Sequence, residues 1–319
     1  MRIKLCQLGG FCLISILLLG LVCACTASTT EESTLPAGAS PFPLEMTDQG
    51  GRVVKLEKMP EKIISLSPSN TEIVFALGLE DKLVGVTTYC NYPEAALDKP
   101  KVGGFSTVDI EKVVEIQPDL ILVTRIHEAE VIPGLERLGL TVLYLYPKTL
   151  DEVLGAITLV GQCTGKEDVA SQLVAELEGR IKAVTDKTAN LTEAQKPRVF
   201  YAVRHDPLWT VGAGHRIHEL IELAGGINIA QDLSGSTTIS LEAVIGANPQ
   251  VIIAGRMGTA ESALEFLKTD ERLRDVDARI SDQLYEVDPN LIGRAGPRIV
   301  DALELLAKMI HPEIFGPIE

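Results

Sequence analysis

Short runs of hydrophobic residues alternate with amphipathic stretches from Ile63 onward, and this alternation predicts strands and helices in turn. Four-residue apolar runs bounded by turn-forming residues are typical of buried strands, whereas apolar residues three and four positions apart indicate helices. The first part of the chain is predicted to form strands 63–66, 83–86, 120–123 and 142–145, and helices 71–77, 109–116 and 130–138. This βαβα order predicts a mainly parallel sheet with helices on both faces.

The alternation stops near residue 148 and resumes after Pro197. Between them, residues 150–163 and 166–191 have helical periodicity, and the second stretch would form a rod of roughly 37 Å at 1.5 Å per residue. Further strands are predicted at 199–203, 251–254 and 284–287, and further helices at 215–223, 264–267 and 297–310. The pattern predicts two α/β lobes, residues 46–148 and 196–319, joined by a helical connector, residues 149–195.

Two segments, residues 109–122 and 240–253, share one pattern. Each begins with a capping residue, an apolar residue and a glutamate, and each ends with a proline followed by a strand. We interpret the pair as a repeat, in which each lobe presents a short helix that opens with Glu111 or Glu242. The alternative is that a common helix–turn–strand unit occurs twice by coincidence.

The N-terminus has the pattern of an export signal. Arg2 and Lys4 precede an apolar run, residues 11–24, which is too short to span a membrane. The residues before Cys25 resemble a bacterial lipoprotein signal, so residues 1–24 are predicted to be removed and Cys25 to be lipidated. An ordinary signal peptide cut nearby is the alternative. Residues 25–45, rich in Ser, Thr, Pro and Ala, are predicted to form a flexible tether.

Composition and charge narrow the class of protein. With 46% hydrophobic and 23% charged residues, the chain of 319 residues is not that of a disordered protein. Its net charge of −15 argues against a nucleic-acid partner. The charge becomes −17 once the signal leaves, because that segment holds two basic residues and no acidic one.

The spacing of the cysteines and histidines gives little indication of a metal-binding site. If the signal is cleaved and Cys25 is lipidated, Cys90 and Cys163 remain, either as one disulfide or as two separate buried thiols. His215 and His218 are three positions apart on a predicted helix and could share a metal, but no further His or Cys lies near them in the sequence. Surface or core histidines are favoured over a metal site.

Several motifs between residues 63 and 311 resemble the cobalamin- and siderophore-binding class of ABC-transporter substrate-binding proteins. They are ISLSPSNTE at 64–72, GVTTY at 85–89, VGGF at 102–105, QPDL at 117–120 and RAGPRI at 294–299. Within this class, YCNYPE at 89–94 is most similar to the cobalamin-binding members. The resemblance implies two Rossmann-like lobes with mainly parallel sheets, joined by one long backbone helix, with a ligand cleft between the lobes.

The resemblance also implies ligand contacts from both lobes. Tyr89 and Phe105 match aromatic positions of the N-terminal lobe, and Trp209 lies near the position of a ring from the C-terminal lobe. Arg294 matches an arginine that reaches the cleft.

Two further candidate residues bear on the identity of the ligand, as do two positions at which this sequence departs from the cobalamin-binding members. Arg204 could neutralise an anionic ligand, and His205 could contact the axial position of a bound metal. Thr124 stands where cobalamin binders can carry tryptophan, and residues 234–238 contain no aromatic residue. These departures imply a more polar cleft, so an iron(III)–siderophore or heme remains an alternative to a corrinoid.

Glu111 and Glu242 match the two glutamates that dock onto arginines of the permease in this class. An exposed carboxylate can form a bidentate pair with a guanidinium. Stabilisation of the helix dipole is an alternative role for each residue.

The resemblance implies a lipid-anchored extracytoplasmic protein, on the outer face of the cytoplasmic membrane or in the periplasm. It would capture cobalamin and deliver it to the permease dimer and ATPase of an ABC importer. No catalytic residue, metal site or resident cofactor is expected. The rival classes are a chelatase-like or metal-cluster enzyme on a related fold, and a structural or adhesive lipoprotein.

Overall fold

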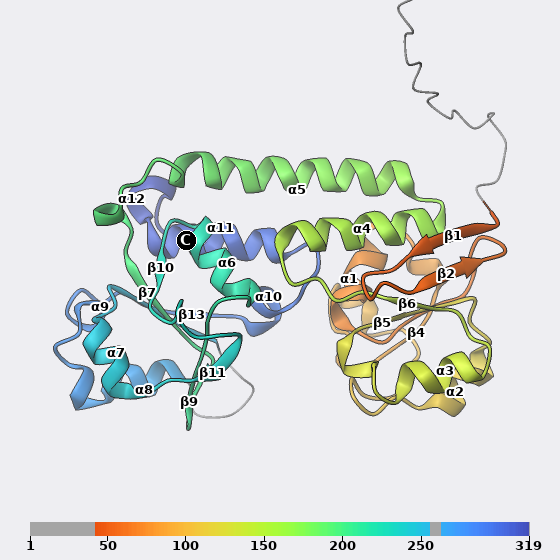
Figure 1. Ribbon diagram of the computed structural model, residues 1–319, viewed down its shortest axis with the longest axis horizontal. Helices are drawn as coiled ribbons and strands as arrows, with labels where there is room; N and C mark the ends of the chain where they lie inside the picture. The colour runs from red at the N-terminus through yellow and green to blue at the C-terminus, as the bar shows by residue number, and fades with distance from the viewer. Residues whose placement is uncertain (1–41, 256–262, 319) are drawn as a thin grey trace, which may run out of the picture. The chain divides into compact units, whose positions relative to one another are not determined.

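The computed structural model describes residues 42–255 and 263–318 (Figure 1). The predicted signal, Cys25 and most of the predicted tether lie outside these residues. Strand β1 (Leu44–Thr47) pairs antiparallel with β2 (Val53–Leu56), a hairpin that the pattern did not predict. Its apolar side chains pack on the core, so the folded part of the chain includes residue 44, just before the predicted boundary at 46.

The N-terminal lobe contains a four-stranded parallel sheet with the strand order β4–β3–β5–β6. Its strands are β3 (Ile63–Ser65), β4 (Leu83–Val86), β5 (Leu120–Val123) and β6 (Val142–Tyr144). Its helices are α1 (Pro68–Ala76), α2 (Ile110–Ile116) and α3 (Val131–Arg137). Every predicted element of this lobe is confirmed, and β4 and β5 have the predicted bounds.

The C-terminal lobe contains a second four-stranded parallel sheet, in the order β10–β7–β12–β13. Its strands are β7 (Arg198–Ala202), β10 (Ile227–Asn228), β12 (Val251–Gly255) and β13 (Leu284–Val287). A small antiparallel sheet that was not predicted lies beside it, with the order β11 (Ser236–Thr238), β9 (Leu208–Val211) and β8 (Arg204–His205). The helices are α6 (Arg216–Leu223), α7 (Leu241–Ala247), α8 (Ala263–Thr269), α9 (Asp277–Ile280), α10 (Pro289–Gly293), α11 (Ile299–Ile310) and α12 (Pro312–Phe315).

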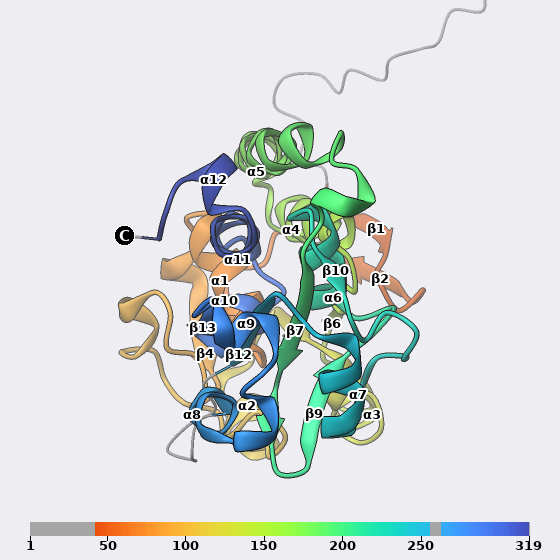
Figure 2. The same cartoon turned by 90° about the vertical axis from the view of Figure 1, so that its left-hand side faces the viewer.

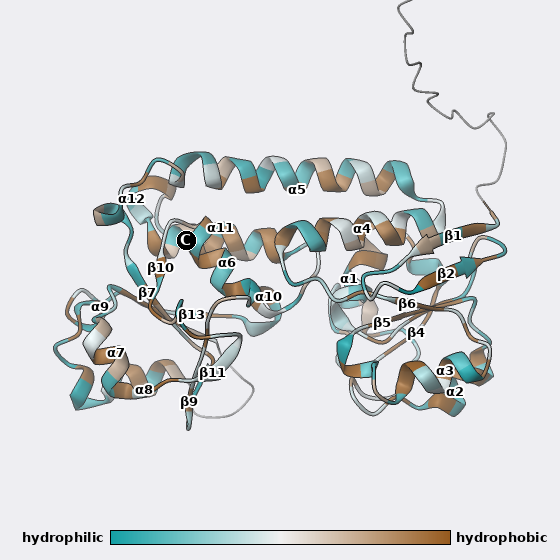
Figure 3. Cartoon of the chain, viewed as in Figure 1, coloured by the Kyte–Doolittle hydropathy of each residue, from teal (hydrophilic) through white to brown (hydrophobic). Residues whose placement is uncertain are grey.

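Two helices form the connector, α4 (Leu150–Thr164) and the longer α5 (Glu167–Thr188). Figure 1 shows α5 running alongside both α4 and α11. The backbones of α4 and α5 approach closely at Gly161, where a Cβ atom would lie 2.5 Å from the Cβ atom of Ala170. The hydropathy colouring of α5 alternates along its length (Figure 3). Within the described ranges, no helix combines the length and apolar character that a membrane span requires.

One hydrophobic core connects the two lobes. Alternate residues of a strand point to opposite faces of its sheet. The residues that face the shared core from the two sheets include Leu120 and Leu122 of β5 and Val199 and Tyr201 of β7. The same cluster continues through buried residues of α4, α5 and α11. The opposite faces of the two sheets have separate cores of their own.

Candidate functional site

Helices α2 and α7, which carry the two predicted docking glutamates, begin in the same way. The Asp109 carboxylate caps α2 by accepting a hydrogen bond from the backbone N–H of Lys112, at 3.1 Å. The Ser240 hydroxyl caps α7 by accepting from the backbone N–H of Ala243, also at 3.1 Å. In both helices the glutamate is the second residue after the cap. Matching caps therefore place Glu111 and Glu242 at equivalent positions.

The two helices also end in the same way. The residue after each helix, Gln117 or Asn248, adopts the left-handed conformation, with φ of 52° and 46°. The Lys62 ammonium donates to the carbonyl of the last residue of α2, at 3.1 Å. The guanidinium Nε of Arg198 donates to the carbonyl of the last residue of α7, at 3.0 Å.

The likeness extends to the residues at the start of strands β3 and β7. The backbone N–H of Lys62, just before β3, donates to the Asp119 carboxylate at 2.9 Å. The backbone N–H of Arg198, the first residue of β7, donates to the Gln250 amide oxygen at 3.1 Å. The repeat inferred from the sequence is thus present in the fold. The residues that contact each helix were not found from the sequence because their types differ between the lobes. Lys62 corresponds to Arg198, and Asp119 corresponds to Gln250.

The side chains of Glu111 and Glu242 are exposed, and neither makes a hydrogen bond or ion pair with any residue of the described ranges. The Arg272 guanidinium donates hydrogen bonds to the Asp270 carboxylate, which raises the pKa of Arg272, and the charge of Glu242 adds to this effect. Figures 1 and 2 both show α2 and α7 on the side of their sheets away from α5. Both carboxylates are therefore available to an external cation.

The aromatic candidates of the N-terminal lobe have different surroundings. Tyr89, in the segment after β4, is 61% exposed. Phe105 is half-buried, and its ring meets the ring of His127 edge-on at 5.7 Å between centroids. Tyr89 is thus the more accessible of the two rings.

His127, which the sequence did not single out, supports the Phe105 segment. Its ring is fully buried and its Nε2 is 2.8 Å from the carbonyl oxygen of Phe105. Its Nδ1 accepts from the backbone N–H of Thr124 at 3.1 Å, so Nε2 carries the proton and donates. Burial lowers the pKa of His127 and favours this neutral form.

Three candidates of the C-terminal lobe, Arg204, His205 and Trp209, lie on the small antiparallel sheet. Arg204 pairs with Trp209 across β8 and β9, and its guanidinium lies 4.9 Å from the centre of the indole ring. The His205 ring stacks on Phe266, with 5.3 Å between centroids and 22° between planes. The indole Nε1 of Trp209 is buried and has no hydrogen-bond acceptor among the described residues. This site therefore offers one unused donor.

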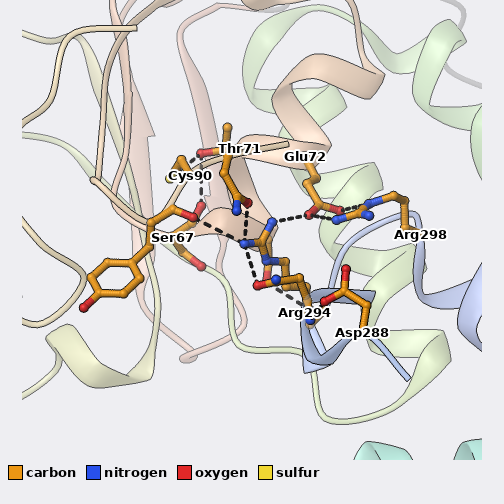
Figure 4. A network of polar contacts seen from close by, with 12 residues as sticks. Ser67, Thr71, Glu72, Cys90, Asp288, Arg294 and Arg298 are labelled. Atoms are coloured by element: carbon orange, nitrogen blue, oxygen red, sulfur yellow. Dashed lines mark hydrogen bonds and ion pairs between the residues drawn. The ribbon is translucent and has the colours of Figure 1, made fainter. Parts of the chain in front are cut away.

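Arg294 connects the C-terminal lobe to the N-terminal lobe (Figure 4). Its Nη1 donates to the Glu72 carboxylate at 3.0 Å. Its Nη2 lies within donor distance of three oxygens: the Tyr89 carbonyl at 3.3 Å, Asn91 at 2.7 Å and Asn290 at 2.9 Å. The arginine predicted to contact ligand is thus already hydrogen-bonded to protein, and it supports the backbone of Tyr89.

Glu72 of α1 is the centre of this network, and we call Glu72, Arg294 and Arg298 the interlobe clamp. Arg298 donates to both Glu72 oxygens, at 3.0 and 2.7 Å. Burial disfavours the charge on Arg298, but the hydrogen bond and charge of Glu72 outweigh it and raise the pKa of Arg298. The guanidinium also lies 3.6 Å from the centre of the Tyr92 ring. A backbone bond from Ala295 to the Ser69 hydroxyl, at 3.1 Å, extends the contact.

A hollow of about 300 Å³ opens beside the clamp. Its walls are mostly apolar and are formed by Glu72, Phe75, Ala76, Tyr92, Pro93, Pro297 and Arg298. None of the predicted ligand-contacting residues lines it.

The remaining histidines and cysteines have structural partners. His215 is the N-cap of α6, where its Nδ1 accepts from the backbone N–H of Ile217 at 3.2 Å. His218 lies near Asn228 and Glu222. Within the part of the chain that the structure covers, no three His, Cys, Asp or Glu residues are grouped so as to hold a metal. Cys90 and Cys163 are both buried and free, so the two-thiol alternative is the one observed.

The chain is similar to transport proteins in sequence. A family model described as periplasmic binding protein matches residues 63–291. An uncharacterised ABC transporter substrate-binding lipoprotein of Bacillus subtilis is 35% identical over 86% of this chain and 87% of its own length. A vitamin B12-binding protein of Vibrio cholerae is 31% identical over 76% of this chain and 87% of its own.

Solved structures agree with this likeness. The periplasmic vitamin B12-binding protein of Vibrio cholerae superposes with a TM-score of 0.66 and 30% identity, over 79% of this chain and 96% of that one. A periplasmic heme-binding protein of Roseiflexus superposes with a TM-score of 0.70 and 27% identity, over 79% of this chain and 98% of that one. Proteins named for different ligands thus share this fold.

Proposed function

The chain belongs to the periplasmic binding protein family, and from this premise we propose that it is the extracytoplasmic solute-binding component of an ABC-type importer, with a corrinoid as its ligand. The ligand class is inferred from the exposed ring of Tyr89. The backbone carbonyl of Tyr89 accepts a hydrogen bond from Arg294, which supports the position of this ring. An aromatic ring on a supported backbone can bury a large area against a flat ligand at a small entropic cost. The relative that is named for vitamin B12 supports the choice of a corrinoid.

Trp209 supplies a second reason for a ligand with polar edges. A buried N–H without an acceptor costs about 1–3 kcal/mol. A carbonyl oxygen on the ligand, such as those of the amide side chains around a corrin ring, would satisfy the indole Nε1. Apolar contact through Tyr89 and polar contact through Trp209 form the usual combination in small-molecule sites.

The equivalent, exposed positions of Glu111 and Glu242 support delivery to a membrane permease. Each carboxylate is exposed, makes no hydrogen bond or ion pair with a described residue, and can accept a bidentate pair from an arginine. One carboxylate per lobe fits a permease dimer, which presents the same surface twice. The protein then acts as a receptor and carrier, without catalysis or a cofactor of its own.

Titration of the purified protein with cyanocobalamin tests the ligand class. We expect saturable binding with one ligand per chain, measured by calorimetry. Tyr89→Ala should weaken it by about fivefold, because roughly 1 kcal/mol of aromatic burial is lost. Leu97→Ala is the matched control, since Leu97 is 53% exposed and lies outside the proposed contacts.

Heme is the second candidate ligand, because a heme-binding structure superposes about as well as the cobalamin-binding one. Binding of heme or of an iron(III)–siderophore, with no response to cyanocobalamin, would replace the corrinoid and leave the transport role intact. Failure to bind any of these three would argue against a chelate receptor.

We also propose that Cys25 carries the lipid that holds the protein at the outer face of the membrane. The motif before Cys25 supports this, as does a 35% identical relative that is named a lipoprotein.

A further inference from the structure

Two exposed apolar side chains occupy equivalent positions on α2 and α7, the helices that carry Glu111 and Glu242. Val114 of α2 is 41% exposed and Ile245 of α7 is 36% exposed. Each follows the glutamate of its helix by three residues. Residues three apart share one face of a helix, so each carboxylate has an apolar neighbour.

The core does not explain these two residues. Val113 and Val244, the residues just before them, are fully buried and hold each helix on its lobe. One exposed valine or isoleucine on a surface needs no explanation. The same placement in both lobes, beside an exposed carboxylate that makes no hydrogen bond or ion pair with a described residue, indicates a shared use.

We propose that each lobe presents a two-part docking face, Glu111 with Val114 and Glu242 with Ile245, to a permease that offers an arginine beside an apolar side chain once for each lobe. The proposal rests on the transport function proposed above. The apolar contact would exclude water from the edge of the ion pair and so reduce its screening.

Charge favours this occupant over a second copy of the chain. A symmetric dimer through these faces would bring glutamate towards glutamate in a protein whose net charge is −15. An arginine has the opposite charge, and its aliphatic stem can lie on Val114 or Ile245 while its guanidinium meets the carboxylate.

Each face has an ion pair beside its glutamate. Lys112, next to Glu111, lies 3.4 Å from the Asp109 carboxylate. In the other lobe Arg272 lies 2.7 Å from the Asp270 carboxylate, and the charge of Glu242 also acts on it. The permease arginine would therefore meet, in each lobe, a carboxylate with one basic residue of this chain nearby.

Binding to the importer of the source organism, purified with its ATPase and reconstituted in lipid nanodiscs, tests the proposal. Val114→Thr keeps the shape of the side chain, and Ile245→Thr keeps its β-branch but shortens it; both changes make the contact polar. Each should raise the Kd for the importer about fivefold, and the double variant about twentyfold. Val169→Thr on α5 is the matched control at 37% exposure, and its Kd should equal that of the wild type. Equal melting temperatures would show that the fold is unchanged.

A second pair of variants separates this inference from the transport function. Glu111→Gln with Glu242→Gln should weaken binding at least as much as the double threonine variant. If the glutamine pair weakens binding while the threonine pair binds within twofold of wild type, the apolar half of the face is refuted and docking stands. If wild-type protein does not bind the importer at all, the proposed function fails and the inference fails with it.

Discussion

Replacing Glu72 by glutamine removes the one negative charge at the centre of the interlobe clamp. The Glu72 side chain is 2% exposed, and the side chains of Arg294 and Arg298 are 11% and 19% exposed. Glutamine has nearly the same shape, so the change removes charge without opening a cavity. We expect the folded state to be destabilised because two partly buried cations lose their counter-charge.

The structure sets the size of this effect. Glu72 accepts three charge-assisted hydrogen bonds of 2.7–3.0 Å. Breaking a buried ion pair costs about 3–5 kcal/mol, but Arg294 keeps its other acceptors and both arginines keep some contact with water. We therefore expect a loss of about 3 kcal/mol in the free energy of unfolding. For a chain of this size, each kcal/mol lowers Tm by about 2–4 °C, so the fall should be about 6–12 °C.

Differential scanning calorimetry at neutral pH measures this change. The matched control is Glu61→Gln, which removes an ion pair with Lys82 from a glutamate that is 66% exposed. Exposed pairs contribute little, so the Tm of the control should stay within about 2 °C of wild type. The reasoning is refuted if the Tm of Glu72→Gln equals the Tm of the control.

Two further changes test other parts of the structure. Burial lowers the pKa of His215 to about 4, and the charges of Arg216 and His218 add to this effect. In the unfolded chain the pKa of this histidine is about 6.5. The unfolded chain therefore binds the extra proton first, and stability should fall as the pH drops from about 6.5 to about 4. His215→Asn keeps an N-cap and should recover about 2 kcal/mol of the loss between pH 7.5 and pH 5, measured by urea unfolding; an unchanged pH profile would contradict this. Cys25→Ser should move the protein from the membrane fraction to the soluble fraction, and mass spectrometry should find no acyl chains; a variant that stays with the membrane would rule out this anchor.

The hydrophobic pattern predicted seven of the eight strands of the two large sheets, because most of these strands are buried on both faces, but it missed the two-residue strand β10. All four residues of β5 are buried, so a continuous apolar run between turn residues located the strand without ambiguity. The small antiparallel sheet gave no such signal. Strand β11 is Ser-Thr-Thr and half exposed, and its existence depends on pairing with β9. Short strands of this kind are specified by tertiary context, which a local pattern does not contain.

The candidate site was predictable only where residue type alone carries the chemistry. The glutamates of the repeat could be found because both halves keep the same residue at the same offset. The role of Arg294 could not be found, because its partner Glu72 is 222 residues away and only the fold brings the two together. His127 was missed for the same reason, since its support of Phe105 spans separate segments of the lobe.

The core shared by the two lobes limits how ligand capture can be signalled to a permease. Protein interiors are close-packed, so a large rotation of one lobe would have to break contacts through α4, α5 and α11 as well as the interlobe clamp. The spacing of Glu111 and Glu242 is therefore largely set when the chain folds, and the docking proposed above would gain affinity from this preorganisation. Under the proposed function, a ligand bound at Tyr89 would act instead through the segment that it touches. Tyr89 and Asn91 are both hydrogen-bonded to Arg294, so a ligand that shifts this segment acts directly on the contact between the lobes.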